Sequence, residues 1–80
     1  MYNLIYLIVD CFVWEWEDEN GNWNPYSLEH QMALFNSKGD DVSLSVAGRN
    51  YEVDKAGLTQ TNSDTGVSRT IRKGQSGICL

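Results

Sequence analysis

The sequence predicts a single α+β domain in which one short helix is followed by a meander of antiparallel strands. Two observations predict it. Apolar and polar residues alternate in residues 11–17 and again from residue 42 onward, which is typical of strands, and between them lies one stretch with apolar residues at helical spacing. The chain has 80 residues, of which 41% are hydrophobic, enough for one small core and not for two.

The first predicted strand covers residues 11–17, where three aromatic side chains alternate with other residues and so share one face. These three are Phe12, Trp14 and Trp16. Asn20 and Gly21 then form a pair that tolerates the positive backbone angles of a hairpin turn. A short second strand through Trp23 completes the hairpin, and Pro25 ends it because proline offers no amide hydrogen.

The helix is predicted to begin after Ser27, whose side chain can cap its N-terminus. Leu28, Met32 and Phe35, at spacings of four and three, place an apolar stripe on one side. Residues 37–39 end the helix, which is about three turns long.

The second half of the chain returns to alternation. Residues 42–46 alternate, and a glycine turn leads into a strand at residues 51–54. A last pair of strands is predicted at residues 58–62 and 67–73, joined by a turn that ends at Gly66.

The two ends of the sequence favour an intracellular protein, nuclear or cytoplasmic. Cys11 and Cys79 lie far apart, whereas a secreted domain of this size usually carries two or more disulfides, so we expect reduced thiols. The apolar residues 1–9 lack a basic start and fall short of the roughly 20 residues that span a bilayer. We therefore expect no membrane partner, a lead-in segment at residues 1–11, the domain at residues 12–73 and a flexible tail at residues 74–80.

Charge restricts the partners further. The net charge of -5 excludes broad, non-specific binding to DNA or RNA, which needs a basic surface. The charge is unevenly distributed, because residues 1–41 carry a net -7 and residues 42–80 a net +2. A local anion site is therefore possible in the second half.

Catalytic and metal sites are not indicated. The single histidine, His30, lies in the first turn of the predicted helix and is interpreted as a solvated side chain rather than a catalytic base. Cys11, His30 and Cys79 do not have the spacing of zinc ligands, and the acidic residues 15–19 lack the ligand pattern of a calcium loop. The domain is therefore predicted to bind rather than to catalyse, without metal or cofactor.

Aromatic residues are abundant, with three tryptophans and four tyrosines. A small core accounts for the tryptophans, whereas Tyr26 and Tyr51 adjoin polar residues and carry hydroxyls that prefer a wet or hydrogen-bonded end. Together with Gln60, Arg69 and Arg72 they would supply what a nucleotide-like ligand requires: ring faces for a base, an amide for its edge and guanidinium groups for phosphate.

The order of these residues resembles the WWE domain, a module named for two tryptophans and a glutamate. Residues 13–27 are similar to the family's opening hairpin and residues 51–72 to its closing strands, and the match covers residues 12–73. The resemblance implies an antiparallel half-barrel sheet wrapped around a single helix. The family's signature glutamate usually lies late in the helix, where this chain has the apolar residues 32–35.

The resemblance also implies a function. WWE domains occur in ubiquitin ligases, including Deltex-type ligases, and in ADP-ribosyltransferases, and many bind iso-ADP-ribose, the linking unit of poly(ADP-ribose). Carried over by position, the ligand contacts fall on Tyr26, Tyr51, Gln60 and Arg69. Arg72 and Lys73 are expected to lie outside this set and to assist with a second phosphate. The expected partners are thus poly(ADP-ribose) on modified proteins and proteins of the ubiquitin system.

An alternative stays open at this point. Some members of the family do not bind ADP-ribose and dock onto proteins instead. Such a module would use an exposed strand edge or the acidic residues 15–19.

Overall fold

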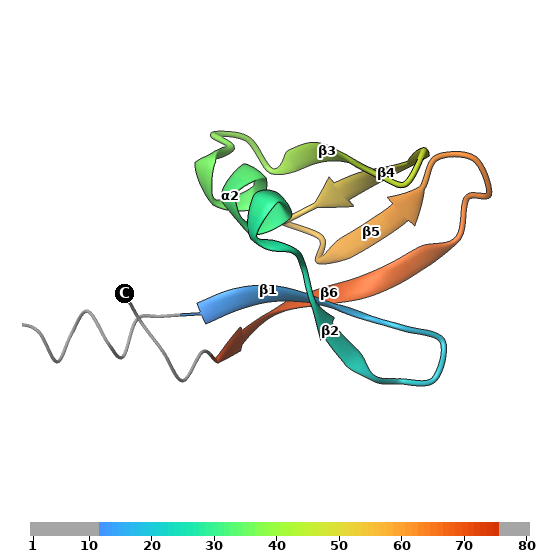
Figure 1. Cartoon of the computed structure of the whole chain (residues 1–80), viewed down its shortest axis with the longest axis horizontal. Coiled ribbons are helices and arrows are strands. Elements are labelled where there is room, and N and C mark those ends of the chain that lie inside the picture. The colour runs from blue at the N-terminus through green and yellow to red at the C-terminus, as the bar shows by residue number, and fades with distance from the viewer. Residues whose placement is uncertain (1–11, 76–80) are drawn as a thin grey trace, which may run out of the picture.

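The computed structural model describes residues 12–75, which form a six-stranded antiparallel sheet and one helix (Figure 1). The elements are β1 (Phe12–Glu17), β2 (Trp23–Pro25), α2 (Leu28–Asn36), β3 (Asp41–Val46), β4 (Arg49–Asp54), β5 (Thr59–Asn62) and β6 (Ser68–Gln75). The strands lie in the order β2-β1-β6-β5-β4-β3, so the first and last strands of the chain are neighbours. The predicted α+β class is confirmed.

The sheet curls into a half-barrel around the helix. Helix α2 packs against both β1 and β3, although three strands separate these two in the sheet. In a flat sheet these two strands would lie too far apart to contact one short helix, so the sheet must curve between them. Figure 1 shows α2 beside the upper strands with β1 and β6 passing below. Among residues 12–75, the expected half-barrel with a single helix is thus confirmed.

The turns lie where the turn residues predicted them, and three strands extend beyond their predicted bounds: β3 and β4 at their starts and β6 at its end. Ala47 and Gly48 join β3 to β4 with φ angles of 51° and 80°, the left-handed pair that a two-residue hairpin requires. Strand β6 continues past its predicted end at residue 73, because Gly74 pairs with Val13 and the following residue with the start of β1. Residues 74 and 75 therefore belong to the sheet rather than to the tail predicted at residues 74–80.

The core lies between the inner face of the sheet and α2. Trp14, Leu34, Val53 and Ile71 are at most 4% exposed, and Tyr26, Val42 and Leu44 complete the buried cluster. Trp14 is thus a core residue as predicted. Trp16 is only partly buried against this cluster.

The apolar stripe of the helix is not the face that packs inward. Leu28, Met32 and Phe35 are 77%, 54% and 49% exposed, whereas Gln31 and Leu34 are buried. At 100° per residue, the buried face is rotated about 100° from the stripe. The reason is that α2 packs against the sheet through one leucine, Leu34, and one hydrogen-bonded glutamine, Gln31. A search for apolar residues at helical spacing does not identify this combination.

The remaining predictions about the termini are not tested. Residues 1–11 and 76–80, which include both cysteines, lie outside the described residues. Within residues 12–75 no helix is long and apolar enough to cross a membrane.

Candidate functional site

The register of three strands places Tyr51, Gln60 and Arg69 on one face of the sheet. Tyr51 of β4 pairs with Asn62 of β5, and Gln60 of β5 pairs with Arg69 of β6. Directly opposed side chains in an antiparallel sheet point to the same face, and so do side chains two positions apart in one strand. Because Gln60 and Asn62 are two positions apart, all of these residues line the inner, concave face.

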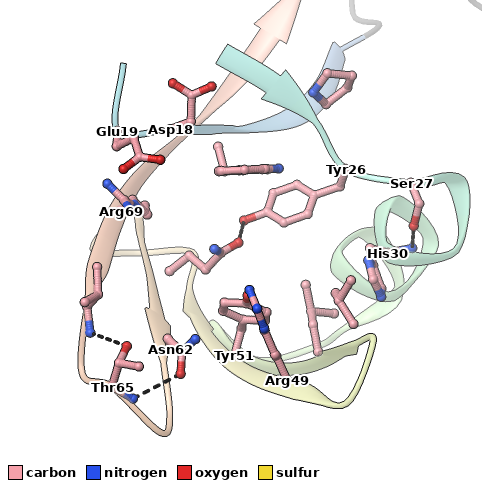
Figure 2. A pocket seen from close by; sticks show the side chains of 16 residues that line it. Asp18, Glu19, Tyr26, Ser27, His30, Arg49, Tyr51, Asn62, Thr65 and Arg69 are labelled. Carbon is pink, nitrogen blue, oxygen red and sulfur yellow. Dashed lines mark hydrogen bonds between the residues drawn. The ribbon is translucent and has the colours of Figure 1, made fainter. Parts of the chain in front are cut away.

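Tyr26 reaches this face from the segment between β2 and α2. Its backbone N–H donates to the Trp14 carbonyl at 3.1 Å, which fixes the point where the chain leaves the sheet. Its hydroxyl donates to Oε1 of Gln60 at 2.5 Å, joining residues 34 positions apart (Figure 2). The four residues expected from the resemblance to contact a ligand therefore meet in space.

They line a pocket of about 530 Å³, a volume typical of small-molecule sites. Tyr26 and Gln60 are 9% and 8% exposed and form its floor, whereas Tyr51 and Arg69 are half-buried at its sides. Three aliphatic side chains form an apolar wall, namely Leu44, Val46 and Val67.

The hydrogen bond on the floor determines what the pocket offers. Burial raises the pKa of the Tyr26 hydroxyl, so the phenol stays protonated and acts as the donor to Gln60. Within residues 12–75, the side-chain nitrogen of Gln60 makes no hydrogen bond. Every buried side-chain nitrogen or oxygen in these residues has a hydrogen-bond partner, so the Gln60 nitrogen is not buried and is accessible from the pocket. A ligand can thus receive N–H donation from Gln60 beside the phenol oxygen.

Charges of both signs surround the mouth. The guanidinium groups of Arg49 and Arg69 line the pocket together with the carboxylates of Asp18 and Glu19. The side-chain amide of Asn24, and after it backbone N–H groups of the same hairpin, hold the pKa of Asp18 below its ordinary value. Figure 2 shows Glu19 and Arg69 on one side of the pocket and His30 on the opposite side. The site is thus a mixed-charge mouth over a mostly uncharged floor.

Arg72, the fifth predicted residue, does not reach the pocket. Its Nε lies 2.8 Å from Oε1 of Glu15, and its guanidinium carbon lies 4.1 Å from the centroid of the Trp23 ring. Positions 69 and 72 are an odd number of residues apart in β6, so the side chains of Arg69 and Arg72 point to opposite faces. The structure therefore brings four of the five predicted residues together and excludes Arg72.

Other lining residues were not found from the sequence. His30, interpreted as a solvated side chain, is half-buried in the pocket wall, with Nε2 3.3 Å from the Ser45 carbonyl oxygen. Arg49 also lines the pocket. A signal for it existed, since Arg49 lies two positions before Tyr51 in the same strand and therefore points to the same face. No comparable signal existed for His30.

Metal coordination finds no support in this part of the chain. Within residues 12–75, no group of three or more histidine, cysteine, aspartate or glutamate side chains could hold a metal ion. The arrangement of rings, an amide and guanidinium groups suits non-covalent recognition of an anionic, aromatic ligand.

Comparison with known proteins agrees with this geometry. The family model of the WWE domain matches residues 12–73. The chain is 31% identical over 64 residues to the E3 ubiquitin-protein ligase DTX4 of Mus musculus, covering 76% of this chain and 10% of that protein. It is 33% identical over 64 residues to the E3 ubiquitin-protein ligase DTX1 of Xenopus laevis, with the same coverage of 76% and 10%. The chain thus spans about a tenth of the length of these relatives, and it belongs to the WWE domain family.

Proposed function

We propose that this domain recognises the iso-ADP-ribose unit of poly(ADP-ribose) and that it does so within a ubiquitin ligase, where it couples ADP-ribosylation to ubiquitination. One observation carries the proposal: two phenol rings, a carboxamide and a guanidinium from four separate segments line a single pocket. The ligase relatives, which are far longer than this chain, support the wider context.

Each lining group has a chemical role toward such a ligand. The free amide N–H of Gln60 donates to a ring nitrogen at the adenine edge, and the Tyr51 ring offers a face for stacking, worth roughly 1 to 3 kcal/mol by analogy with bases stacked on aromatics. Arg69 pairs with a phosphate in a charge-assisted hydrogen bond worth about 1.5 to 3 kcal/mol.

The second phosphate is better assigned to Arg49 than to Arg72. Arg49 lines the pocket, whereas Arg72 lies on the outer face beside Glu15. The carboxylates of Asp18 and Glu19 oppose a dianionic ligand at the mouth, so association is slowed and affinity depends on short-range contacts.

Calorimetric titration of the domain with iso-ADP-ribose, ADP-ribose and ATP in parallel tests the proposal. Arg69→Ala is expected to weaken iso-ADP-ribose binding by about 10- to 150-fold, which is the loss of 1.5 to 3 kcal/mol. Arg72→Ala is the matched control, because it removes the same charge from the same strand outside the pocket. It is expected to leave the affinity within about twofold.

Two outcomes would refute the proposal. The first is the absence of heat and of chemical-shift changes when the folded wild-type domain is titrated with iso-ADP-ribose. The second is an equal loss of affinity in the Arg69 and Arg72 variants, which would indicate general charge attraction rather than recognition in the pocket.

A protein-docking function is the second candidate, and one observation favours it. Leu28, Met32 and Phe35 form an exposed apolar stripe on α2, and a contiguous exposed apolar patch is typical of a protein-interaction site. A docking module would be indifferent to ADP-ribose and would lose its partner when Met32 or the acidic residues 15–19 are changed. Partner capture that survives both changes would contradict this function.

A further inference from the structure

Gln31 of α2 completes the hydrogen bonding of β1 at the point where β2 ends. The ladder between these strands stops at the pair of Glu15 with Pro25, so the next residue, Trp14, has no strand partner on that side. Oε1 of Gln31 accepts from the Trp14 N–H at 2.8 Å, and Nε2 donates to the Trp14 carbonyl at 2.8 Å. This double exchange is the pattern of a hydrogen-bonded pair in an antiparallel sheet, made here by a side chain.

The same carboxamide also holds the backbone of Tyr26. The second N–H of Nε2 donates to the Tyr26 carbonyl at 3.3 Å, while the Tyr26 N–H donates to the Trp14 carbonyl. Gln31 is 8% exposed, and its oxygen and both of its N–H groups have partners. One side chain thus satisfies two backbone groups that the end of β2 leaves without ladder partners, the Trp14 N–H and the Tyr26 carbonyl, and it gives the Trp14 carbonyl a second donor beside the Tyr26 N–H.

We propose that Gln31 is a positioning residue for the pocket: its carboxamide fixes the exit of the chain from β2 and thereby sets the Tyr26 phenol against Gln60. Gln31 does not line the pocket itself, so it acts through Tyr26. The effect on ligand affinity rests on the proposed function, whereas the effect on Trp14 and Tyr26 does not.

Hydrogen bonding, rather than packing, is the property that this position requires. A methionine of similar length would fill the space but leave the Trp14 N–H and the Tyr26 carbonyl without partners. A glutamate would keep the acceptor for the Trp14 N–H and place a second oxygen against two carbonyl oxygens. Protonation of that carboxyl restores one donor, and burial raises its pKa, so the rescue falls at mildly acidic pH.

The experiment compares Gln31→Met and Gln31→Glu with Glu29→Gln, the converse exchange at an exposed position of the same helix. Amide hydrogen exchange at Trp14 reports the local bonds, and exchange at Val53, in a strand paired on both sides, reports global stability. The ring-carbon chemical shift of Tyr26 reports its bond to Gln60.

We expect Gln31→Met to lower the protection factor of Trp14 about tenfold or more, the loss of one well-formed hydrogen bond, and to shift the Tyr26 resonances at every pH. Gln31→Glu should do the same at pH 7.5 and recover most of the protection at about pH 5. Val53 protection should fall by less than Trp14 protection, the Tyr51 ring resonances should stay unchanged, and Glu29→Gln should behave as wild type.

Unchanged Trp14 protection and Tyr26 shifts in the variants would overturn the proposal. A parallel fall at Val53 would also overturn it, because Gln31 would then support the whole fold rather than one position. Titration with iso-ADP-ribose separates the two proposals: a wild-type domain that does not bind refutes the proposed function and leaves the exchange results decisive. If the wild type binds, unaltered affinity in Gln31→Met refutes the positioning role.

Discussion

Tyr26→Phe tests the hydrogen bond that closes the pocket floor. The substitution keeps the ring and removes only the hydroxyl, so Oε1 of Gln60 loses its donor. Both side chains are less than a tenth exposed, which limits the replacement of the donor by water. Leaving such an acceptor unsatisfied costs about 1 to 3 kcal/mol, and we expect the free energy of unfolding to fall by that amount.

A double-mutant cycle separates the bond from the packing around it. Gln60→Met leaves the Tyr26 hydroxyl without its acceptor and is expected to be similarly destabilising. In the double variant neither polar group remains, so its loss should be smaller than the sum of the single losses by about 1 to 2 kcal/mol.

Urea denaturation at neutral pH, followed by tryptophan fluorescence, measures all four proteins of the cycle. Additive losses within about 0.5 kcal/mol would show that the two side chains do not interact. A Tyr26→Phe variant as stable as wild type would refute the reasoning directly.

Burial of the Tyr26 hydroxyl also predicts that the free energy of unfolding falls at alkaline pH. Burial raises the pKa of Tyr26 in the folded protein above its ordinary value of 10.0, so above pH 10 the unfolded chain ionises first. The contribution of the Tyr26 hydroxyl to the free energy of unfolding is therefore complete below pH 10. Above pH 10 it declines by at most about 1.4 kcal/mol per pH unit. Tyr26→Phe should decline less steeply, and identical alkaline slopes would contradict the burial.

Further substitutions test the helix face, the end of the helix and the hairpin. Leu34→Ala should lower the free energy of unfolding by about 2 to 5 kcal/mol and Leu28→Ala by less than about 0.5 kcal/mol in urea denaturation; equal effects would contradict the assigned face. The Lys55 ammonium donates to two carbonyls at the end of α2, at 2.9 and 3.2 Å. Lys55→Met should therefore lower the free energy of unfolding by about 1 kcal/mol and speed amide exchange in the last helical turn. Unaltered exchange would show that the ammonium does not hold the helix end. Hydrogen bonds lower the pKa of Asp18 in the folded protein below its ordinary value of 3.8. The contribution of Asp18 to folding stability is therefore complete above pH 3.8 and is lost as the pH falls through the lowered pKa. The Asn22 amide should accordingly lose protection in acid in the wild type and much less in Asp18→Asn, and equal acid profiles would refute this.

The strands were predictable because their information is local. Alternation in one segment reports which side chains face a core, and turn residues report where a strand ends. Trp14 and the hairpin turn after β3 were located in this way. The pairing of β1 with β6 could not be predicted from alternation, because it joins the two ends of the domain and follows from closure of the curl.

The face of the helix was obscured by two features. The apolar residues of α2 form a regular stripe, yet the sheet covers a neighbouring face that contains only one large aliphatic residue, Leu34. The second buried residue, Gln31, is polar and owes its place to backbone groups of β1 and Tyr26. A hydrophobic pattern identifies neither a partner across the domain nor a side chain that substitutes for a strand.

The candidate site shows the same division between local and long-range information. The composition supplied rings, an amide and guanidinium groups, but only the resemblance to a family selected which ones belong together. Alternation along the strand places Arg69 and Arg72 on opposite faces but does not say which face is concave. The strand register shows that Arg69 lies on the concave face, because it is paired with Gln60, whereas Arg72 is paired with Glu15. His30 stayed unidentified because its place depends on how α2 lies across the opening.

One face of the sheet builds both the core and the pocket, and Gln60 lies on the border between them. It is directly opposite Val53, which is 1% exposed in the core, and two positions from Asn62, which lines the pocket. A change at Gln60 therefore alters stability and ligand contacts together, so lost binding in such a variant does not by itself identify a ligand contact. Arg69 is half-buried and outside the core cluster, so its substitution can remove binding without unfolding the domain. The arginine pair in β6 is for this reason the sharper test of function.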